Sequence, residues 1–167
     1  MGGHCSRRTL LSLSIGGLTA LSGCSVTKSE QQPLTALFGG HSVAYDHDRV
    51  RLSLSTSTVQ LTETFEFTVT NTSEAMVSLG CGNPWTVQKY RDERWRDLLV
   101  TSADGFGGCG TDLPPGESRT DQVTLSKAAL ETETETLNED LTPGQYRLVL
   151  LSTDPFLAEE FRVRGQQ

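Results

Sequence analysis

A run of residues with strict two-residue periodicity limits this chain to β-structure. Between positions 59 and 69, apolar side chains occupy odd positions and polar side chains, mostly threonine, occupy even ones. Successive side chains of a strand point to opposite faces, so this pattern predicts a strand with one face on a core and the other in water. Glu63 interrupts the apolar parity, which predicts a turn or an edge near it. Phe65, Phe67 and Val69 are therefore predicted to lie at the centre of the core.

Turn sequences divide the rest of the chain into short segments. Asn71-Thr72-Ser73, Pro115-Gly116-Glu117 and Pro143-Gly144-Gln145 combine residues that favour tight turns. Short apolar runs lie between these turns, and Ser126 to Glu131 has the pattern of a single helical turn. Many short strands at this spacing predict an all-β fold, an antiparallel β-sandwich of about seven or eight strands.

The first 23 residues have the three parts of a signal peptide. Arg7 and Arg8 provide a basic start, residues 10–21 are weakly apolar, and Ser22-Gly23 supply small residues at a cleavage site. A helix that spans a membrane needs roughly 20 apolar residues, and this segment is shorter. We therefore expect a processed signal rather than a transmembrane helix.

Two motifs in this region indicate how the chain is exported and where it stays. Residues 6–11, Ser-Arg-Arg-Thr-Leu-Leu, resemble a twin-arginine export signal, and an ordinary secretion signal is the alternative. Leu21-Ser22-Gly23-Cys24 resembles a lipobox, where the signal is cut and the new N-terminal cysteine receives lipid. The resemblance implies a lipoprotein attached to the cell membrane through Cys24, with its domain outside the cell. The alternative is a soluble secreted protein that is cut nearby.

These motifs divide the chain into three parts. We expect residues 1–23 to be the signal, residues 24–44 a tether, and residues 45–167 one folded domain. Residues 25–44 lack periodicity and contain turn-forming residues, as tethers do. The boundary stays open, because three apolar residues of this segment have the potential to dock on the domain: Leu34, Leu37 and Phe38.

The charge of the chain excludes some classes of partner. The sequence has 14 basic and 21 acidic residues, and removal of the signal with Arg7 and Arg8 leaves 12 − 21 = −9. Such an acidic surface argues against nucleic acid or anionic lipid as the partner. Only three lysines occur, and this acidic, lysine-poor composition resembles that of proteins from salt-loving archaea.

The cysteines predict a single disulfide. Of the four in the sequence, Cys5 leaves with the signal and Cys24 receives lipid, so Cys81 and Cys109 remain in an oxidising compartment. Each lies between two glycines, which allow backbones to approach closely. We expect Cys81 and Cys109 to pair as a structural staple.

Four sequence segments, in this order, resemble a known family. They are Phe67-Thr68-Val69-Thr70-Asn71, Arg91-Asp92-Glu93 with Trp95 after it, Pro115-Gly116-Glu117, and Pro143-Gly144-Gln145-Tyr146. This pattern resembles the bacterial immunoglobulin-like domains of the intracellular proteinase inhibitor type, over roughly residues 59–151. The resemblance implies an immunoglobulin-like β-sandwich. The chain departs from that family in its cysteine pair and its export signal, so a role against an intracellular protease is not expected.

Several residues are candidates for a site, each with a simpler interpretation. Asn71-Thr72-Ser73 matches the acceptor sequence for N-glycosylation, although it also forms a turn. Trp85, Tyr90 and Trp95 form a candidate binding surface, and the alternative is that they fill the core. Asp46-His47-Asp48 and the acidic segment 131–140 lack the spacing of a metal site, so we predict no metal there.

The sequence favours a binding module over an enzyme. After the signal the only histidines are His41 and His47, and no serine lies in a nucleophile elbow. We therefore predict no catalytic residue and no cofactor. The first hypothesis is a cell-surface lipoprotein that binds an envelope or extracellular partner. The alternatives are a secreted protease inhibitor that presents a loop such as 101–112, and a structural envelope protein without a discrete ligand.

Overall fold

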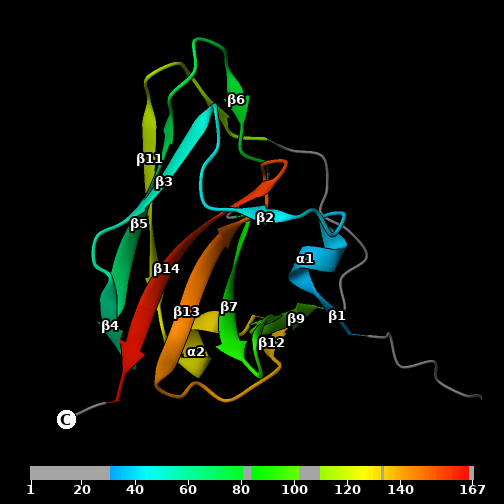
Figure 1. Cartoon of the computed structure of the whole chain (residues 1–167), viewed down its shortest axis with the longest axis vertical. Helices are drawn as coiled ribbons and strands as arrows, with labels where there is room; N and C mark the ends of the chain where they lie inside the picture. The colour runs from blue at the N-terminus through cyan, green and yellow to red at the C-terminus, as the bar shows by residue number, and fades with distance from the viewer. Residues whose placement is uncertain (1–30, 81–83, 102–109, 133, 166–167) are drawn as a thin grey trace, which may run out of the picture.

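Two β-sheets packed face to face form the body of the protein (Figure 1). The structure is a computed structural model, which describes residues 31–80, 84–101, 110–132 and 134–165. The smaller sheet has the order β11 (Ser118–Thr124), β5 (Thr64–Asn71) and β3 (Val50–Leu54). The larger sheet has the order β2 (Val43–Ala44), β14 (Phe156–Arg164), β13 (Gly144–Leu150), β7 (Trp85–Arg91) and β8 (Arg94–Asp97), and β4 (Thr58–Gln60) pairs in parallel with β14.

Short elements extend this sandwich at its ends. They are the strands β1 (Gln32–Pro33), β9 (Leu99–Thr101) and β12 (Glu135–Leu137) in one small sheet, the pair β6 (Val77–Ser78) and β10 (Asp112–Leu113), and the helical turns α1 (Leu34–Leu37) and α2 (Lys127–Leu130). The predicted helical turn after Ser126 is confirmed as α2. The Ser126 side chain caps it by accepting a hydrogen bond from the Ala129 amide. The all-β antiparallel sandwich is confirmed as well.

The core lies where the sequence periodicity predicts it. Phe65, Phe67 and Val69 are 2%, 1% and 2% exposed, whereas Glu66 between them faces solvent. The Phe67 ring lies 5.9 Å from the ring of Trp85, on the opposite sheet, in an edge-to-face contact. The β5 side chains therefore join the two sheets, and the predicted register of this strand is confirmed.

The long alternating run divides into two strands that belong to different sheets. β4 pairs with β14 of the larger sheet, whereas β5 pairs with β3 and β11 of the smaller one. Thr62 lies between them with a positive φ of 70°, and the Glu63 carboxylate accepts a hydrogen bond from the Gln60 amide at 2.7 Å. The turn that we predicted near Glu63 is thus the place where the chain crosses from one sheet to the other.

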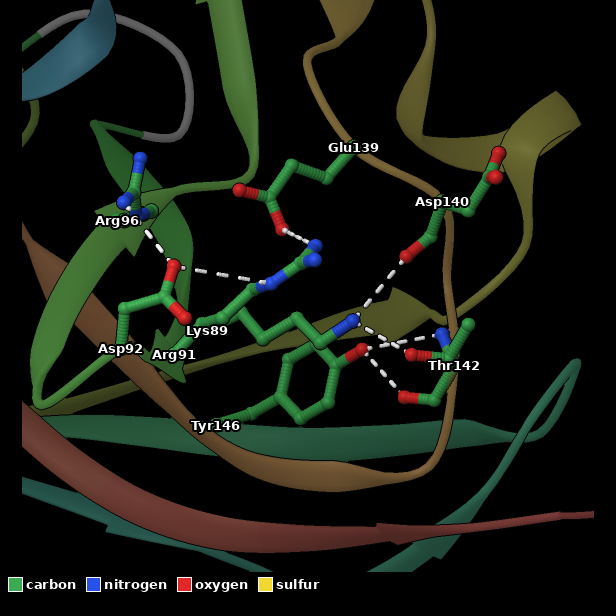
Figure 2. Close-up of polar contacts among 8 residues, drawn as sticks. All are labelled: Lys89, Arg91, Asp92, Arg96, Glu139, Asp140, Thr142 and Tyr146. Atoms are coloured by element: carbon green, nitrogen blue, oxygen red, sulfur yellow. Dashed lines mark hydrogen bonds and ion pairs between the residues drawn. The ribbon is translucent and has the colours of Figure 1, made fainter.

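A tyrosine corner fixes the start of β13 (Figure 2). The Tyr146 ring is fully buried, and its hydroxyl donates to the Thr142 carbonyl at 2.6 Å. The same oxygen accepts a hydrogen bond from the Thr142 amide at 3.3 Å. Such a contact to the backbone a few residues upstream is typical of immunoglobulin-like sandwiches. The Pro143-Gly144 turn therefore has a structural role, because it brings Tyr146 back to Thr142.

Residues 32–44 pack on the sandwich and form part of the folded unit. Gln32 pairs with Thr101 between β1 and β9, and Leu34 is 1% exposed. Leu37 and Phe38 are partly buried against the core. The docking that we left open is thus observed, and the folded domain begins well before residue 45. No helix of the described ranges is long and apolar enough to cross a membrane.

The strands that flank the two cysteines are held together. β6 and β10 are antiparallel, and beyond them the Leu79 amide donates to the Thr111 carbonyl and the Thr111 amide to the Gly80 carbonyl, both at 2.9 Å. Gly80 directly precedes Cys81, and Thr111 follows Cys109 by two residues. Both cysteines lie outside the described residues, so their disulfide stays a prediction.

The burial of β5 makes a stability prediction with an internal control. Phe67→Ala should lower the free energy of unfolding by about 3–5 kcal/mol, because it removes a fully buried ring. Thr68→Ala, on the outer face of the same strand, should change it by no more than about 0.5 kcal/mol. Chemical denaturation of both variants measures these values. A larger loss for Thr68→Ala would mean that the register of β5 is inverted.

The cysteine pair is checked by labelling and mass measurement. The exported protein is unfolded without reductant and treated with an alkylating reagent. We expect no label on Cys81 or Cys109, because a disulfide leaves no free thiol, and two labels after reduction. Labelling of both residues before reduction would rule the disulfide out.

Candidate functional site

Exposed aromatic side chains collect on the outer side of the larger sheet, which faces away from the smaller sheet. This aromatic face consists of Tyr45, Tyr90 and Trp95 with Arg147 beneath them. Tyr45 and Tyr90 are 50% and 43% exposed. Trp95 is half-buried, and its ring meets that of Tyr90 edge to face at 5.2 Å. Tyrosine and tryptophan are enriched where proteins bind partners, so these rings on one face mark a candidate binding surface.

Strand alternation explains why these side chains share a side. Tyr90 pairs with Trp95 across the β7–β8 hairpin, so both rings lie on the same face. Lys89 and Arg91, their neighbours along β7, point to the opposite side. Asp92 and Glu93 form the tight turn between the strands, with positive φ values of 51° and 61°, which matches the twist of a two-residue hairpin.

Arg147 is the fixed centre of the aromatic face. Its guanidinium carbon lies 4.4 Å from the centroid of the Trp95 ring and 5.9 Å from that of Tyr45. Its Nε donates to Gln88 Oε1 at 2.7 Å, and its Nη1 donates to the Tyr45 hydroxyl at 3.0 Å. The side chain is only 7% exposed. Cation–π contacts and directed hydrogen bonds therefore hold both aromatic rings in place.

A row of polar side chains crosses the sheet under these rings. Asp97, Gln88, Arg147 and Glu160 are successive partners in the strand register of β8, β7, β13 and β14. Gln88 donates to Asp97 Oδ1 at 3.3 Å, and Thr35 of α1 donates to Oδ2 at 2.6 Å. The docked N-terminal segment thus completes the row, and the face depends on its packing.

Burial is the strongest influence on the carboxyl group of Asp97 in this row. It raises the pKa of Asp97, although hydrogen bonds from Thr35 and Gln88 and the charge of Arg147 oppose the shift. Burial and a hydrogen bond to Glu160 raise the pKa of Tyr45 as well. The Tyr45 hydroxyl therefore stays neutral near pH 7 and keeps its ability to donate a hydrogen bond.

The structure separates the three aromatic residues that the sequence brought together. Tyr90 and Trp95 lie on the aromatic face, whereas Trp85 packs on the core side against Phe67. Sequence reasoning missed Tyr45 and Arg147. Arg147 could have been noticed in the sequence, because it is the one charged residue in the otherwise apolar run Tyr146-Arg147-Leu148-Val149-Leu150. A buried arginine in such a strand needs partners, and here they are aromatic rings.

Asn71 has a structural role at the end of β5. It is fully buried, and its Nδ2 donates to the Ala75 carbonyl at 2.7 Å and to the Leu113 carbonyl at 2.8 Å. Its Oδ1 accepts from the Ser73 amide and hydroxyl. A sugar on Nδ2 would replace one of these donors and needs space that a buried atom lacks. This packing is therefore incompatible with glycosylation of Asn71.

The acidic tripeptide Asp46-His47-Asp48 lies beside a cleft of about 590 Å³ at one end of the sandwich. Residues 76–78 and 152–155 line the same cleft. His47 Nδ1 accepts a hydrogen bond from the Arg49 amide at 3.1 Å, which fixes the loop. In the described part of the chain, no three His, Cys, Asp or Glu side chains are placed to hold a metal ion.

Several predicted site residues fall outside the described residues. They are Arg7 and Arg8 of the signal, Cys24, and the pair Cys81 and Cys109. Most of the loop 101–112, which we considered for protease inhibition, also falls outside them. These assignments stay predictions.

Comparison with solved structures finds partial similarities at low sequence identity. A β-glucosidase from Listeria innocua is 19% identical over 70% of this chain and 16% of its own, with a TM-score of 0.36. The alkylpurine DNA glycosylase AlkC from Pseudomonas fluorescens is 13% identical over 71% of this chain and 31% of its own, with a TM-score of 0.36. The sulfur carrier protein SoxY from Chlorobium limicola f thiosulfatophilum is 9% identical over 80% of this chain and 93% of its own, with a TM-score of 0.34. None of these similarities bears on function.

Comparison with protein families gives a direct assignment. No curated protein matches the chain. A family model described as Bacterial Ig-like domain matches residues 46–161, which is more than half of the chain. The matched region contains the smaller sheet, the larger sheet except β2 and the last three residues of β14, and the aromatic face except Tyr45. The chain therefore belongs to the bacterial Ig-like domain family.

Proposed function

We propose that this protein is a non-catalytic binding module that uses its aromatic face to hold a protein partner outside the cell. Domains of this fold serve many functions, so the fold alone supports either a binding or a structural role. The observation that carries the proposal is the exposure of Tyr45 and Tyr90 above a buried, hydrogen-bonded Arg147. Tyrosine, tryptophan and arginine are the residues that contribute most to protein–protein binding energy.

Rigidity supports the same proposal. Binding costs free energy when side chains lose rotamer freedom. Arg147 already donates a hydrogen bond to the Tyr45 hydroxyl, and the Trp95 ring packs on the Arg147 guanidinium. These side chains are therefore already ordered in the free protein. Less conformational free energy is lost on binding, and the affinity for the partner is higher.

The location of the protein at the cell membrane is part of the proposal. A lipid on Cys24 would hold the domain at the outer side of the cell membrane, where an envelope or extracellular protein is within reach. The lipobox Leu21-Ser22-Gly23-Cys24 and the basic start at Arg7 and Arg8 support this assignment. The negative charge of the mature chain disfavours direct binding to anionic membrane lipids. The lipid attached to Cys24 would therefore provide the attachment.

The binding role predicts a selective loss of partner. Solubilised envelope is passed over immobilised wild-type protein, Tyr90→Ala and the control Met76→Ala, and captured proteins are quantified by mass spectrometry. Met76 is 54% exposed but lines the cleft beside Asp46-His47-Asp48, so the control removes a similar apolar surface outside the aromatic face. We expect one partner to be retained by wild type and Met76→Ala and reduced about tenfold or more by Tyr90→Ala.

Thermal unfolding of each variant checks that the loss does not come from unfolding. Equal capture by all three proteins would contradict the role of the aromatic face. Absence of any captured protein would favour the alternative of a structural envelope protein.

Membrane attachment makes a separate prediction. Cells that produce wild-type protein or Cys24→Ser are fractionated, and each fraction is probed with an antibody. We expect wild type in the membrane fraction and Cys24→Ser in the soluble fraction or the medium, because serine accepts no thioether lipid. Soluble wild-type protein would contradict the anchor.

A further inference from the structure

β11 forms the free margin of the smaller sheet (Figure 1). It runs from Ser118 to Thr124 and pairs with β5 on one side, and no described strand pairs with its other edge. It has seven residues, whereas the other strands at the ends of the two sheets, β3, β8 and β2, have five, four and two. An exposed edge of this length is a template for pairing with another strand.

Strand alternation determines which backbone groups of β11 point outward. Directly before the strand, the Glu117 carbonyl accepts a hydrogen bond from the Asn71 amide of β5 at 2.9 Å. The odd-numbered residues of β11 therefore bond to β5, and the even-numbered ones direct their amide and carbonyl groups away from it. At the far end the Thr124 carbonyl accepts from the Ser126 amide, which closes the edge there. The open backbone groups belong to Ser118, Thr120 and Gln122.

β11 lacks the common devices that protect an exposed edge. It contains no lysine and no proline, and its pairing with β5 is continuous over the whole strand. Charges that point to the core side are another such device, and β11 has two, Arg119 and Asp121. They neutralise each other, because Arg119 Nε lies 2.9 Å from Asp121 Oδ2 and Nη2 donates to Oδ1 at 3.3 Å. The strand therefore carries no net charge that would repel a second strand.

We propose that β11 pairs antiparallel with β11 of a second copy of this chain, so that two smaller sheets join across a two-fold axis. The outward backbone groups place Thr120 opposite Thr120 of the other copy, and Ser118 opposite Gln122. In this register Arg119 of each copy lies opposite Asp121 of the other. A shift of the two-fold axis by one residue to either side would place two arginines or two aspartates opposite each other. Charge complementarity therefore selects the register that is centred on Thr120.

The outer face of β11 suits the same contact. Thr120 Oγ1 lies 2.8 Å from Thr68 Oγ1, and Ser118 Oγ lies 2.8 Å from Thr70 Oγ1, both within hydrogen-bond distance. Cross-strand pairs of hydroxyl side chains stabilise antiparallel sheets, and the Thr120 pair would continue this row into the second copy. Backbone hydrogen bonds provide most of the contact, so the dimer is a weak one. The contact does not rest on the proposed partner binding, because the aromatic face belongs to the larger sheet.

The test begins with sedimentation velocity of the full exported protein from micromolar to submillimolar concentration, in about 0.15 M sodium chloride. We expect an equilibrium between monomer and dimer that shifts toward dimer as the concentration rises. Thr120→Pro removes an outward amide and no hydrogen bond to β5, so the variant should fold and dimerise about tenfold more weakly or less. A wild-type protein that stays monomeric throughout would overturn the proposal and leave the edge to a strand of another protein.

Two charge reversals test the register itself. Arg119→Glu places two acids opposite each other, and Asp121→Arg places two arginines opposite each other, so each variant alone should dimerise about tenfold more weakly or less. In an equal mixture of the two variants, opposite charges face each other again at both positions, and the dimer should return. Damage to the fold of either variant would not produce such recovery.

Arg51→Glu is the matched control for the charge reversals. Arg51 is exposed on β3 of the same sheet, and its reversal changes the net charge by the same amount as Arg119→Glu. It should keep wild-type dimerisation. Weak association of the mixed variants, or equal losses from Arg51→Glu and Arg119→Glu, would overturn the proposal. A dimer that both single variants retain would overturn it as well, because the copies would then associate through another surface.

Discussion

The burial of one face of each sheet against the other is the constraint on which this structure depends. Phe67 of the smaller sheet and Trp85 of the larger one meet in the centre, and both strands must keep their parity for that contact to exist. Since a shift by one residue would move every side chain to the wrong face, the same constraint fixes what the outer faces carry. The aromatic face is thus a consequence of the core register.

Sequence periodicity predicted the centre of the fold and failed at its margins. Phe65, Phe67 and Val69 could be assigned because eight residues of alternation leave one register. The strands β1, β9 and β12 have two or three residues each, too few for a period to be recognised. Their pairing depends on contacts between residues far apart in the chain, such as Gln32 with Thr101. The break at Glu63 predicted a turn or an edge, but the sequence did not show that the chain changes sheet there.

The candidate site was only half predictable for a related reason. Tyr90 and Trp95 lie five residues apart and could be named from the sequence as a candidate surface, whereas their pairing across the turn Asp92-Glu93 is known from the structure. Tyr45 and Arg147 are 102 residues apart, so nothing local indicates their hydrogen bond. The hairpin illustrates what a two-residue period achieves once the fold is known. One β-ribbon carries the rings of Tyr90 and Trp95 on one side and the cations of Lys89 and Arg91 on the other, so a partner on the aromatic side would not touch these cations.

With lipid on Cys24, the docking of residues 32–44 would also limit how far the domain can move. Seven peptide units separate Cys24 from Gln31. An extended chain advances at most about 3.3–3.6 Å per residue, so these units span no more than about 25 Å. With lipid on Cys24, the sandwich would stay within roughly its own diameter of the bilayer. Its partners would then be proteins of the same membrane or of the layer directly above it, and a protein on a neighbouring cell would lie beyond its radius of capture.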